Sequence, residues 1–243
     1  MRYIAAATAL FLAFLVLVDL STLGLRIYRG RQLSSQSLPF EREVSPAIGT
    51  ILVVGDSTGV GTGAFHPGDS IAGRIAREFP GVAVTNRARN GAKTGDVIAQ
   101  LRDGDNRFFD VVLIQTGGND ILRFTPLGRL RDAVETLLDS ALIRGDHVIF
   151  LSTGNVGLAP AFFPPLNWIY TWRTRQVREI LIKASAERGV EYVDLFREKE
   201  EDPFTRQPER FYAPDFLHPG GGGYGYWYEE IKRQSSLTSI LSS

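Results

Sequence analysis

A serine and an aspartate–histidine pair lie far apart in the 243-residue chain, but their types and surroundings could combine in one reaction. Ser57 follows the apolar run TILVV in a Gly-Asp-Ser turn, and the segment APDFLHPG carries Asp215 and His218. A serine hydroxyl becomes an effective nucleophile when an imidazole takes its proton and a carboxylate orients that imidazole. These three residues therefore indicate acyl chemistry on Ser57. In isolation, D-x-x-H is equally typical of a helix N-terminus with an incidental histidine.

Two further loops could supply donors for the negative charge that develops during such a reaction. Gly91 lies in ARNGAKTGD and Asn119 in QTGGND, each directly after an expected strand. A glycine N–H and an asparagine amide are groups that form oxyanion holes. Either loop alone is also typical of an ordinary turn, because asparagine and glycine dominate turns. Their placement after successive strands favours the oxyanion hole.

The stretch after Ser57 has a competing interpretation as a nucleotide-binding loop. From Gly59 it matches G-x-G-x-x-G/A, the fingerprint of dinucleotide-binding domains. That fingerprint requires an acidic residue at the end of the second strand, where this chain has Asn86 and Arg87, and a helix opening on the glycines, which Pro67 delays. A dinucleotide-binding oxidoreductase therefore stays a weak alternative.

Strands and helices alternate along the chain and predict an α/β fold. Short β-rich runs occupy 50–55, 82–88, 110–117, 147–153 and 190–196, and helical patterns occupy 69–79, 94–102, 127–144, 167–188 and about 223–233. The run after Thr50 and the run after Asp110 are solidly apolar, as in strands buried on both faces. We therefore expect a five-stranded parallel sheet covered by helices on both faces, with the site at the carboxyl ends of the strands.

The composition excludes several classes of function. Basic and acidic residues are equal in number at 27 each, without a Lys/Arg run, so nucleic acid is not an expected partner. The absence of cysteine excludes disulfides and thiol catalysis. Aspartates gather near the expected strand ends, but a second histidine at ligand spacing is missing, so we predict neither a metal nor another cofactor. Of the three histidines, His147 is expected at the start of a strand and therefore at the edge of the sheet opposite the site.

The N-terminal segment 1–28 is apolar from Tyr3 to Val18 and is intermediate in length between a membrane-spanning helix and a signal peptide. We expect an uncleaved single-helix anchor with the domain on the extracytoplasmic side, although the downstream arginines alone slightly favour the cytoplasm. A secreted or periplasmic protein after signal cleavage, and a buried helix, are the alternatives. The polar residues 29–48 predict a linker or strap, and the Ser-rich residues 235–243 a flexible tail.

Aromatic side chains cluster after the fourth expected strand. Phe162, Phe163 and Trp168 lie in a long segment at the edge that should hold the site, and His66 lies at the rim of the Ser57 loop. One interpretation is a substrate-binding surface for an apolar acyl or aryl group that leans on a membrane. The other is that the aromatic residues pack the segment against the core and that His66 is a solvated loop residue.

Four short blocks, taken together, resemble the SGNH/GDSL hydrolase superfamily. They are GDS at 55–57, NG at 90–91, GGND at 117–120 and DFLH at 215–218. The blocks occur in the order of that family and on the expected elements. The resemblance implies a flavodoxin-like three-layer α/β/α fold over a catalytic domain at 49–234.

The resemblance also implies roles for individual residues. Ser57 would be the nucleophile, His218 the base and Asp215 its orienting acid. The oxyanion hole would comprise the backbone N–H groups of Ser57 and Gly91 and the side chain of Asn119. The expected enzyme is a GDSL-type esterase or lipase that acts on lipid-like, acyl or acetyl esters. An acyltransferase or a non-catalytic relative is the alternative.

The glycines of HPGGGGYGYW are unfavourable in a helix, so we predict that the last helix begins only after Gly223.

Overall fold

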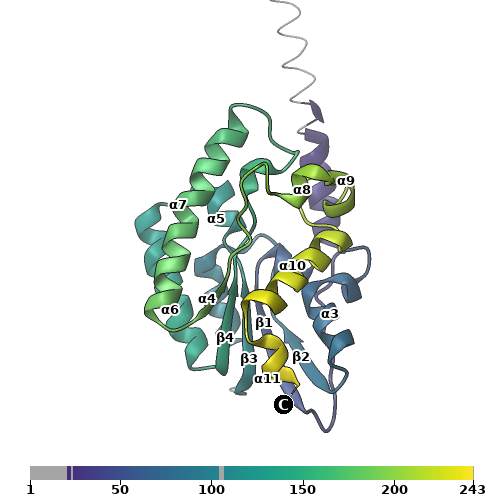
Figure 1. The fold of residues 1–243 in the computed structure, drawn as a ribbon, viewed down its shortest axis with the longest axis vertical. Coiled ribbons are helices and arrows are strands. Elements are labelled where there is room, and N and C mark those ends of the chain that lie inside the picture. Colours follow the sequence, from purple (N-terminus) through teal and green to yellow (C-terminus); the bar gives the residue numbers. More distant parts are fainter. Residues whose placement is uncertain (1–20, 23, 104–106, 243) are drawn as a thin grey trace, which may run out of the picture.

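The computed structural model of the chain describes residues 21–22, 24–103 and 107–242. Five parallel strands form one sheet in the order β2-β1-β3-β4-β5 (Figure 1). The strands are β1 Gly49–Gly55, β2 Val82–Asn86, β3 Phe109–Gln115, β4 Gly145–Leu151 and β5 Glu191–Val193. The predicted five-stranded parallel sheet is therefore confirmed, with each strand within a few residues of its expected position.

The apolar composition of β1 explains why it lies near the centre of the sheet. Its side chains alternate between two fully buried clusters, with Ile51 and Val53 in one and Leu52 and Val54 in the other. Ile51 is in register with Val84 on one side and with Val111 on the other. A strand that is buried on both faces needs apolar residues at successive positions, as the sequence of β1 has.

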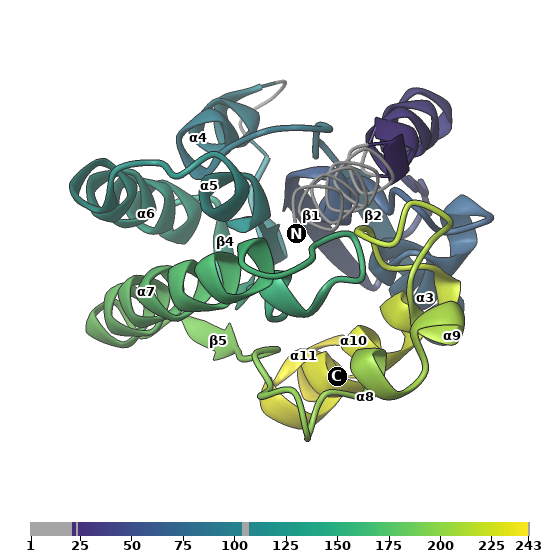
Figure 2. The same ribbon diagram turned by 90° about the horizontal axis from the view of Figure 1, so that it is seen from above.

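Helices cover both faces of the sheet, so the flavodoxin-like three-layer architecture is also confirmed (Figure 2). One face packs against α3 Ile71–Glu78, α10 Gly221–Gln234 and α11 Leu237–Leu241. The other face packs against α4 Thr94–Arg102, α6 Leu127–Leu142 and α7 Leu166–Glu187.

Short helices complete the connections. They are α2 Ser57–Val60, η1 Pro67–Asp69, α5 Gly118–Leu122, η2 Val156–Leu158, α8 Pro203–Arg206 and α9 Pro208–Phe211. Two of them, α2 and α5, begin just after β1 and β3 at the carboxyl edge of the sheet. This edge is where parallel α/β folds place their ligands.

Helix α10 begins at Gly221, before the residue at which the sequence predicts it to begin. The glycines are needed for close packing. A Cβ on Gly222 would lie 2.4 Å from the carbonyl oxygen of Arg210, and one on Gly223 would lie 2.3 Å from that of Phe211. Packing of the α10 start against α9 thus outweighs the helix cost of glycine, about 1 kcal/mol per residue.

Both ends of the described chain form helices where the polar sequence predicts a linker and a flexible tail. Residues 24–36, which overlap the expected linker, form a helix (the N-terminal helix). Residues 237–241, within the expected tail, form α11, because Leu237 and Leu241 are buried in the core. The apolar segment upstream lies almost entirely outside the described residues, and no described helix has the length and apolarity needed to span a membrane.

Candidate active site

The Ser57 loop is shaped by the residue before it. The Asp56 carboxylate caps α2 by accepting hydrogen bonds from the backbone N–H and the hydroxyl of Thr58, both at 2.8 Å. Ser57 is therefore the first residue of a single helical turn that begins where β1 ends. Burial raises the pKa of Asp56 to about 6, even though the hydrogen bonds from Thr58 lower it. Asp56 therefore has a structural role, because its hydrogen bonds hold the loop that carries Ser57.

The loop before α10 presents Asp215 and His218. One carboxylate oxygen of Asp215, Oδ1, accepts the backbone N–H groups of Leu217 and His218 at 3.1 Å each. The other, Oδ2, lies 2.6 Å from Nδ1 of His218. The opposite ring nitrogen, Nε2, lies 3.1 Å from Oγ of Ser57. The structure thus brings the three predicted residues into one chain of hydrogen bonds.

The charge state of Asp215 fixes the direction of these hydrogen bonds. Burial acts to raise the pKa of Asp215, but the hydrogen bond and charge of His218 and the two backbone donors outweigh it, and the pKa falls below its ordinary value. The ionised carboxylate can only accept, so Nδ1 of His218 carries the proton that it donates. Nε2 is then the nitrogen that can accept the proton of Ser57.

The glycines after Ser57 allow close packing of neighbouring loops. A Cβ on Gly63 would lie 2.4 Å from the carbonyl oxygen of Pro219, next to the histidine. A Cβ on Gly59 would lie 2.8 Å from the Cβ atom of Ala88. The hydroxyl of buried Tyr224 adds a hydrogen bond to the carbonyl oxygen of Thr62 at 2.8 Å. These packing contacts explain why the stretch is rich in glycine, and a bound nucleotide is not needed to explain it.

Gly91 and Asn119 line the same cavity as Ser57. Gly91 has a positive φ of 77°, a conformation that favours glycine. The loop of Asn119 is held to α4, because the Asp120 carboxylate accepts the backbone N–H and hydroxyl of Thr94 at 2.8 Å each. Two predicted oxyanion donors therefore lie at the cavity wall with the serine.

The cavity has a volume of about 810 Å³. Its lining combines the polar side chains of Ser57 and His218 with apolar side chains such as those of Phe162, Leu166 and Tyr170. This combination of a few polar groups and a large apolar surface is typical of sites for small organic ligands.

A family model for GDSL-like lipases and acylhydrolases matches residues 53–226. The chain belongs to this GDSL-like lipase/acylhydrolase family. The matched range contains all four blocks noted in the sequence, from GDS to DFLH. No match was found among curated protein sequences.

Solved structures with the same fold include members of that family. A lipolytic G-D-S-L protein from Veillonella parvula is 19% identical, with a TM-score of 0.59 over 76% of this chain and 96% of that one. A lipase/acylhydrolase from Enterococcus faecalis is 20% identical, with a TM-score of 0.59 over 80% and 96%. An acetylxylan esterase from Geobacillus stearothermophilus is 18% identical, with a TM-score of 0.55 over 77% and 94%. At such identities the likenesses show a shared fold.

The N-terminal helix forms one wall of the cavity in this GDSL-family chain, which the sequence does not reveal. Its residues Arg26, Ile27 and Gly30 line the cavity. A Cβ on Gly30 would lie 3.1 Å from Oδ2 of Asp215, so a glycine here lets the helix approach the loop that carries Asp215 and His218. The helix is tied down by Asn90, whose side chain donates to the carbonyl oxygen of Ser34 at 2.8 Å.

Three of the four residues predicted to bind substrate do not line the cavity. Phe162 does, and its ring packs 4.5 Å from that of Tyr170. His66 is exposed with its ring against Phe65, and Trp168 is 67% exposed on α7. Phe163 lies outside the lining, below the guanidinium of Arg26 at 5.1 Å. His66, Phe163 and Trp168 therefore lie outside the cavity lining, because placement at the expected edge does not determine which way a side chain points.

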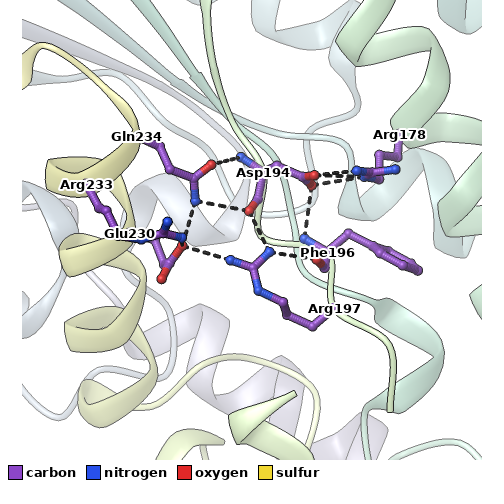
Figure 3. A network of polar contacts seen from close by, with 7 residues as sticks. All are labelled: Arg178, Asp194, Phe196, Arg197, Glu230, Arg233 and Gln234. Carbon is purple, nitrogen blue, oxygen red and sulfur yellow. Dashed lines mark hydrogen bonds and ion pairs between the residues drawn. The ribbon is translucent and has the colours of Figure 1, made fainter. Parts of the chain in front are cut away.

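Arg197 is a cavity residue that the sequence analysis did not single out. Its guanidinium donates to Glu230 at 2.8 Å and to the carbonyl oxygen of Asp194 at 3.0 Å (Figure 3). Asp194 also binds Arg178 of α7 and the side chain of Gln234 (Figure 3). This network fastens the segment after β5 to α7 and α10. Within the described ranges, no cluster of three or more His, Asp or Glu side chains could hold a metal ion.

Proposed function

We propose that this protein is a serine hydrolase that cleaves carboxylic esters through Ser57, His218 and Asp215. The observation that carries the proposal is the continuous chain from Oγ of Ser57 through both ring nitrogens of His218 to the Asp215 carboxylate, at 3.1 and 2.6 Å. Nucleophile, base and orienting group within hydrogen-bond distance are the requirement for an activated serine. Membership of the GDSL-like lipase/acylhydrolase family supports the same chemistry.

The first half of the reaction forms an acyl-enzyme. Oγ of Ser57 attacks the ester carbonyl carbon while Nε2 of His218 accepts the hydroxyl proton. The resulting imidazolium is stabilised by the ionised Asp215. When the tetrahedral intermediate collapses, the carbon–oxygen bond to the alcohol breaks, and His218 gives its proton to the departing oxygen.

The second half releases the acid. A water molecule replaces the alcohol, His218 accepts one of its protons, and the hydroxide attacks the acyl carbon. Collapse of this second intermediate breaks the bond to Oγ, and His218 returns the proton to Ser57. The protein thus regains its starting protonation state, and one ester and one water become one acid and one alcohol.

The negative oxygen of both intermediates needs donors on the cavity wall. We assign this role to the backbone N–H groups of Ser57 and Gly91 and to the side-chain amide of Asn119. Their common location in the cavity lining supports the assignment. Donors that are already positioned before the reaction stabilise developing charge without reorganisation.

The cavity favours an apolar acyl or aryl group. Beyond the nucleophile, its lining continues over Phe162, Tyr170, Leu195 and Phe204, and its volume of about 810 Å³ exceeds the needs of an acetyl group. We therefore propose lipid-like or other apolar esters as the substrates. The fold itself does not decide, since an acetylxylan esterase shares it.

A chain-length series of p-nitrophenyl esters, from acetate to palmitate, tests this function on the full chain in detergent. We expect the maximum of kcat/KM at a chain longer than acetate and its loss in Ser57→Ala. A maximum at acetate contradicts the apolar substrate. Full activity in Ser57→Ala contradicts the proposed mechanism altogether.

The location of the domain stays a prediction. We propose that residues 1–28 act as a membrane anchor and that the domain lies on the extracytoplasmic side. Protease accessibility of the domain in right-side-out and inverted membrane vesicles tests this topology. Digestion in right-side-out vesicles alone is expected, and digestion in inverted vesicles alone contradicts it.

A further inference from the structure

Two neighbouring segments that each contribute to the cavity lining also expose apolar side chains, and we call this surface the entry face. On the N-terminal helix and at the start of α7, its members are Leu25, Ile27, Tyr28, Leu166, Trp168, Ile169 and Trp172. Each is at least 40% exposed, and Trp168 and Trp172 are 67% and 56% exposed. A group of exposed tryptophans and leucines on one side of a protein marks an interaction site.

The two segments of the entry face are joined directly. The Arg26 side chain donates a hydrogen bond to the carbonyl oxygen of Pro160, and its guanidinium lies over the ring of Phe163, in the loop that leads to α7. Both segments lie beyond the carboxyl edge of the sheet (Figure 1). Ile27 and Leu166 belong to the entry face and also line the cavity, so the face borders the cavity mouth.

Positive charge borders the entry face on the N-terminal helix. Residues 24–36 contain Arg26, Arg29 and Arg31 and neither aspartate nor glutamate, although the whole chain has a net charge of zero. Residues 154–178 also lack acidic residues, but Arg175 and Arg178 are paired there with Glu198 and Asp194. Exposed Arg31 and Arg123 line the cavity itself. The apolar surface is therefore bordered by positive charge from the N-terminal helix and from Arg123, while Arg175 and Arg178 of α7 are neutralised by Glu198 and Asp194.

We propose that the entry face docks onto the surface of an anionic phospholipid bilayer. Tryptophan and tyrosine side chains favour the interface between lipid and water, and arginines favour the anionic headgroups. The sequence directly upstream of the N-terminal helix is apolar from Tyr3 to Val18, so this end of the domain is the one that a membrane-bound segment would bring to the bilayer.

Docking in this orientation has a consequence for the substrate. The cavity mouth opens toward the bilayer, so an apolar ester can pass from lipid to Ser57 without crossing water. This consequence rests on the proposed function. The docking itself does not, because it depends on the surface alone.

Tryptophan depth in vesicles tests the docking on the full chain. The chain has three tryptophans, and Trp227→Phe leaves Trp168 and Trp172 as the emitters. With vesicles of phosphatidylcholine and phosphatidylglycerol, we expect a blue shift and quenching of more than half of the emission by lipids brominated in the acyl chains. The control Trp168→Phe/Trp172→Phe keeps only the buried Trp227 and should stay unquenched.

The depth of Trp168 and Trp172 in the bilayer distinguishes docking of the entry face from attachment through residues 1–20 alone. A vesicle-bound chain whose Trp168 and Trp172 emission is unshifted and unquenched overturns the proposal. Quenching that is equally strong in pure phosphatidylcholine overturns the role assigned to the arginines.

A second assay separates the docking from the chemistry. Trp168→Ser/Trp172→Ser should lower hydrolysis of a vesicle-embedded ester several-fold and leave hydrolysis of a soluble short-chain ester unchanged. The matched control Phe108→Ser/Ile143→Ser removes two exposed apolar side chains next to the starts of β3 and β4, at the opposite edge, and should affect neither. Equal losses in both double variants overturn the proposal. If the wild type hydrolyses neither ester, the proposed function fails, and the quenching experiment still decides the docking.

Discussion

The two walls of the cavity are built in different ways. On the catalytic wall, Asp56 and Asp215 each accept two or more hydrogen bonds at 2.6 to 3.1 Å, and glycines such as Gly63 allow loops to approach closely. The second, apolar wall is defined by lining side chains such as Ile27, Phe162, Leu166 and Tyr170, from the N-terminal helix, the loop before α7 and α7. The first wall depends on exact positions and the second on size and apolarity. Changes to the first should therefore affect rate, and changes to the second should affect selectivity.

The largest effect is expected on the catalytic wall from Ser57→Ala. Loss of the nucleophile should lower kcat by about 10⁴-fold or more, because removing a member of such a triad leaves only residual catalysis. Steady-state hydrolysis of a soluble ester measures the loss, and circular dichroism checks the fold. Ser239→Ala, an exposed serine of α11, serves as the control and should keep full activity.

Asn119→Ala probes the same wall without touching the triad. If its amide is an oxyanion donor, kcat should fall by about 10²–10³-fold with little change in KM. A rise in KM at constant kcat would instead place Asn119 among residues that bind the ground state, and would weaken the contrast between the walls.

Asp56→Asn tests the cost of the buried carboxyl on the catalytic wall. The pKa of Asp56 is raised from 3.8 to about 6 in the folded protein, so the folded state binds this proton more tightly and wild-type stability falls as the pH rises through this window. The variant lacks this titration. Its free energy of unfolding relative to wild type should increase by up to about 3 kcal/mol between the two pKa values. Urea denaturation of both proteins across that pH range measures the two free energies of unfolding. A difference between them that stays constant with pH contradicts the prediction.

Gly30→Val tests the place where the two walls meet. The added side chain would press on Oδ2 of Asp215, so we expect a loss in kcat of about tenfold, equivalent to ~1.4 kcal/mol. Gly24→Val on the same helix is the matched control, because a Cβ there has no atom within 4 Å. Equal activity in both variants would show that the helix does not position the carboxylate.

Phe162→Ala should give the smallest change in rate. It enlarges the apolar wall, so kcat for a short ester should change less than threefold, an effect of about 0.6 kcal/mol, while the preferred acyl chain becomes longer. The p-nitrophenyl series measures both. A large loss of kcat for every chain length would contradict the division between the walls.

The sequence predicted the catalytic wall well because its signals are local. Apolar runs identified the strands, and parallel strands bring the residues that follow them to one edge, so Ser57 and Asn119 were placed correctly. The pair Asp215 and His218 lies within four residues. Short-range spacing of this kind is visible without a structure.

The apolar wall could not be predicted, because it is built from contacts between distant segments. The approach of Gly30 to Asp215 joins positions that no local pattern relates, and the polar sequence from residue 29 suggested a linker. Periodicity indicated α7 but not which of its aromatic side chains face inward: Tyr170 lines the cavity, whereas Trp168, which was expected in the substrate-binding surface, does not. The early start of α10 likewise depends on packing against α9.

Covalent labelling tests the central claim most directly. The full chain is treated with a fluorophosphonate, and the modified peptide is located by mass spectrometry. We expect one adduct on the peptide that contains Ser57, no adduct in Ser57→Ala, and much slower labelling in His218→Ala. Labelling of another residue, or undiminished labelling of Ser57→Ala, would contradict the assignment of Ser57 as the activated nucleophile.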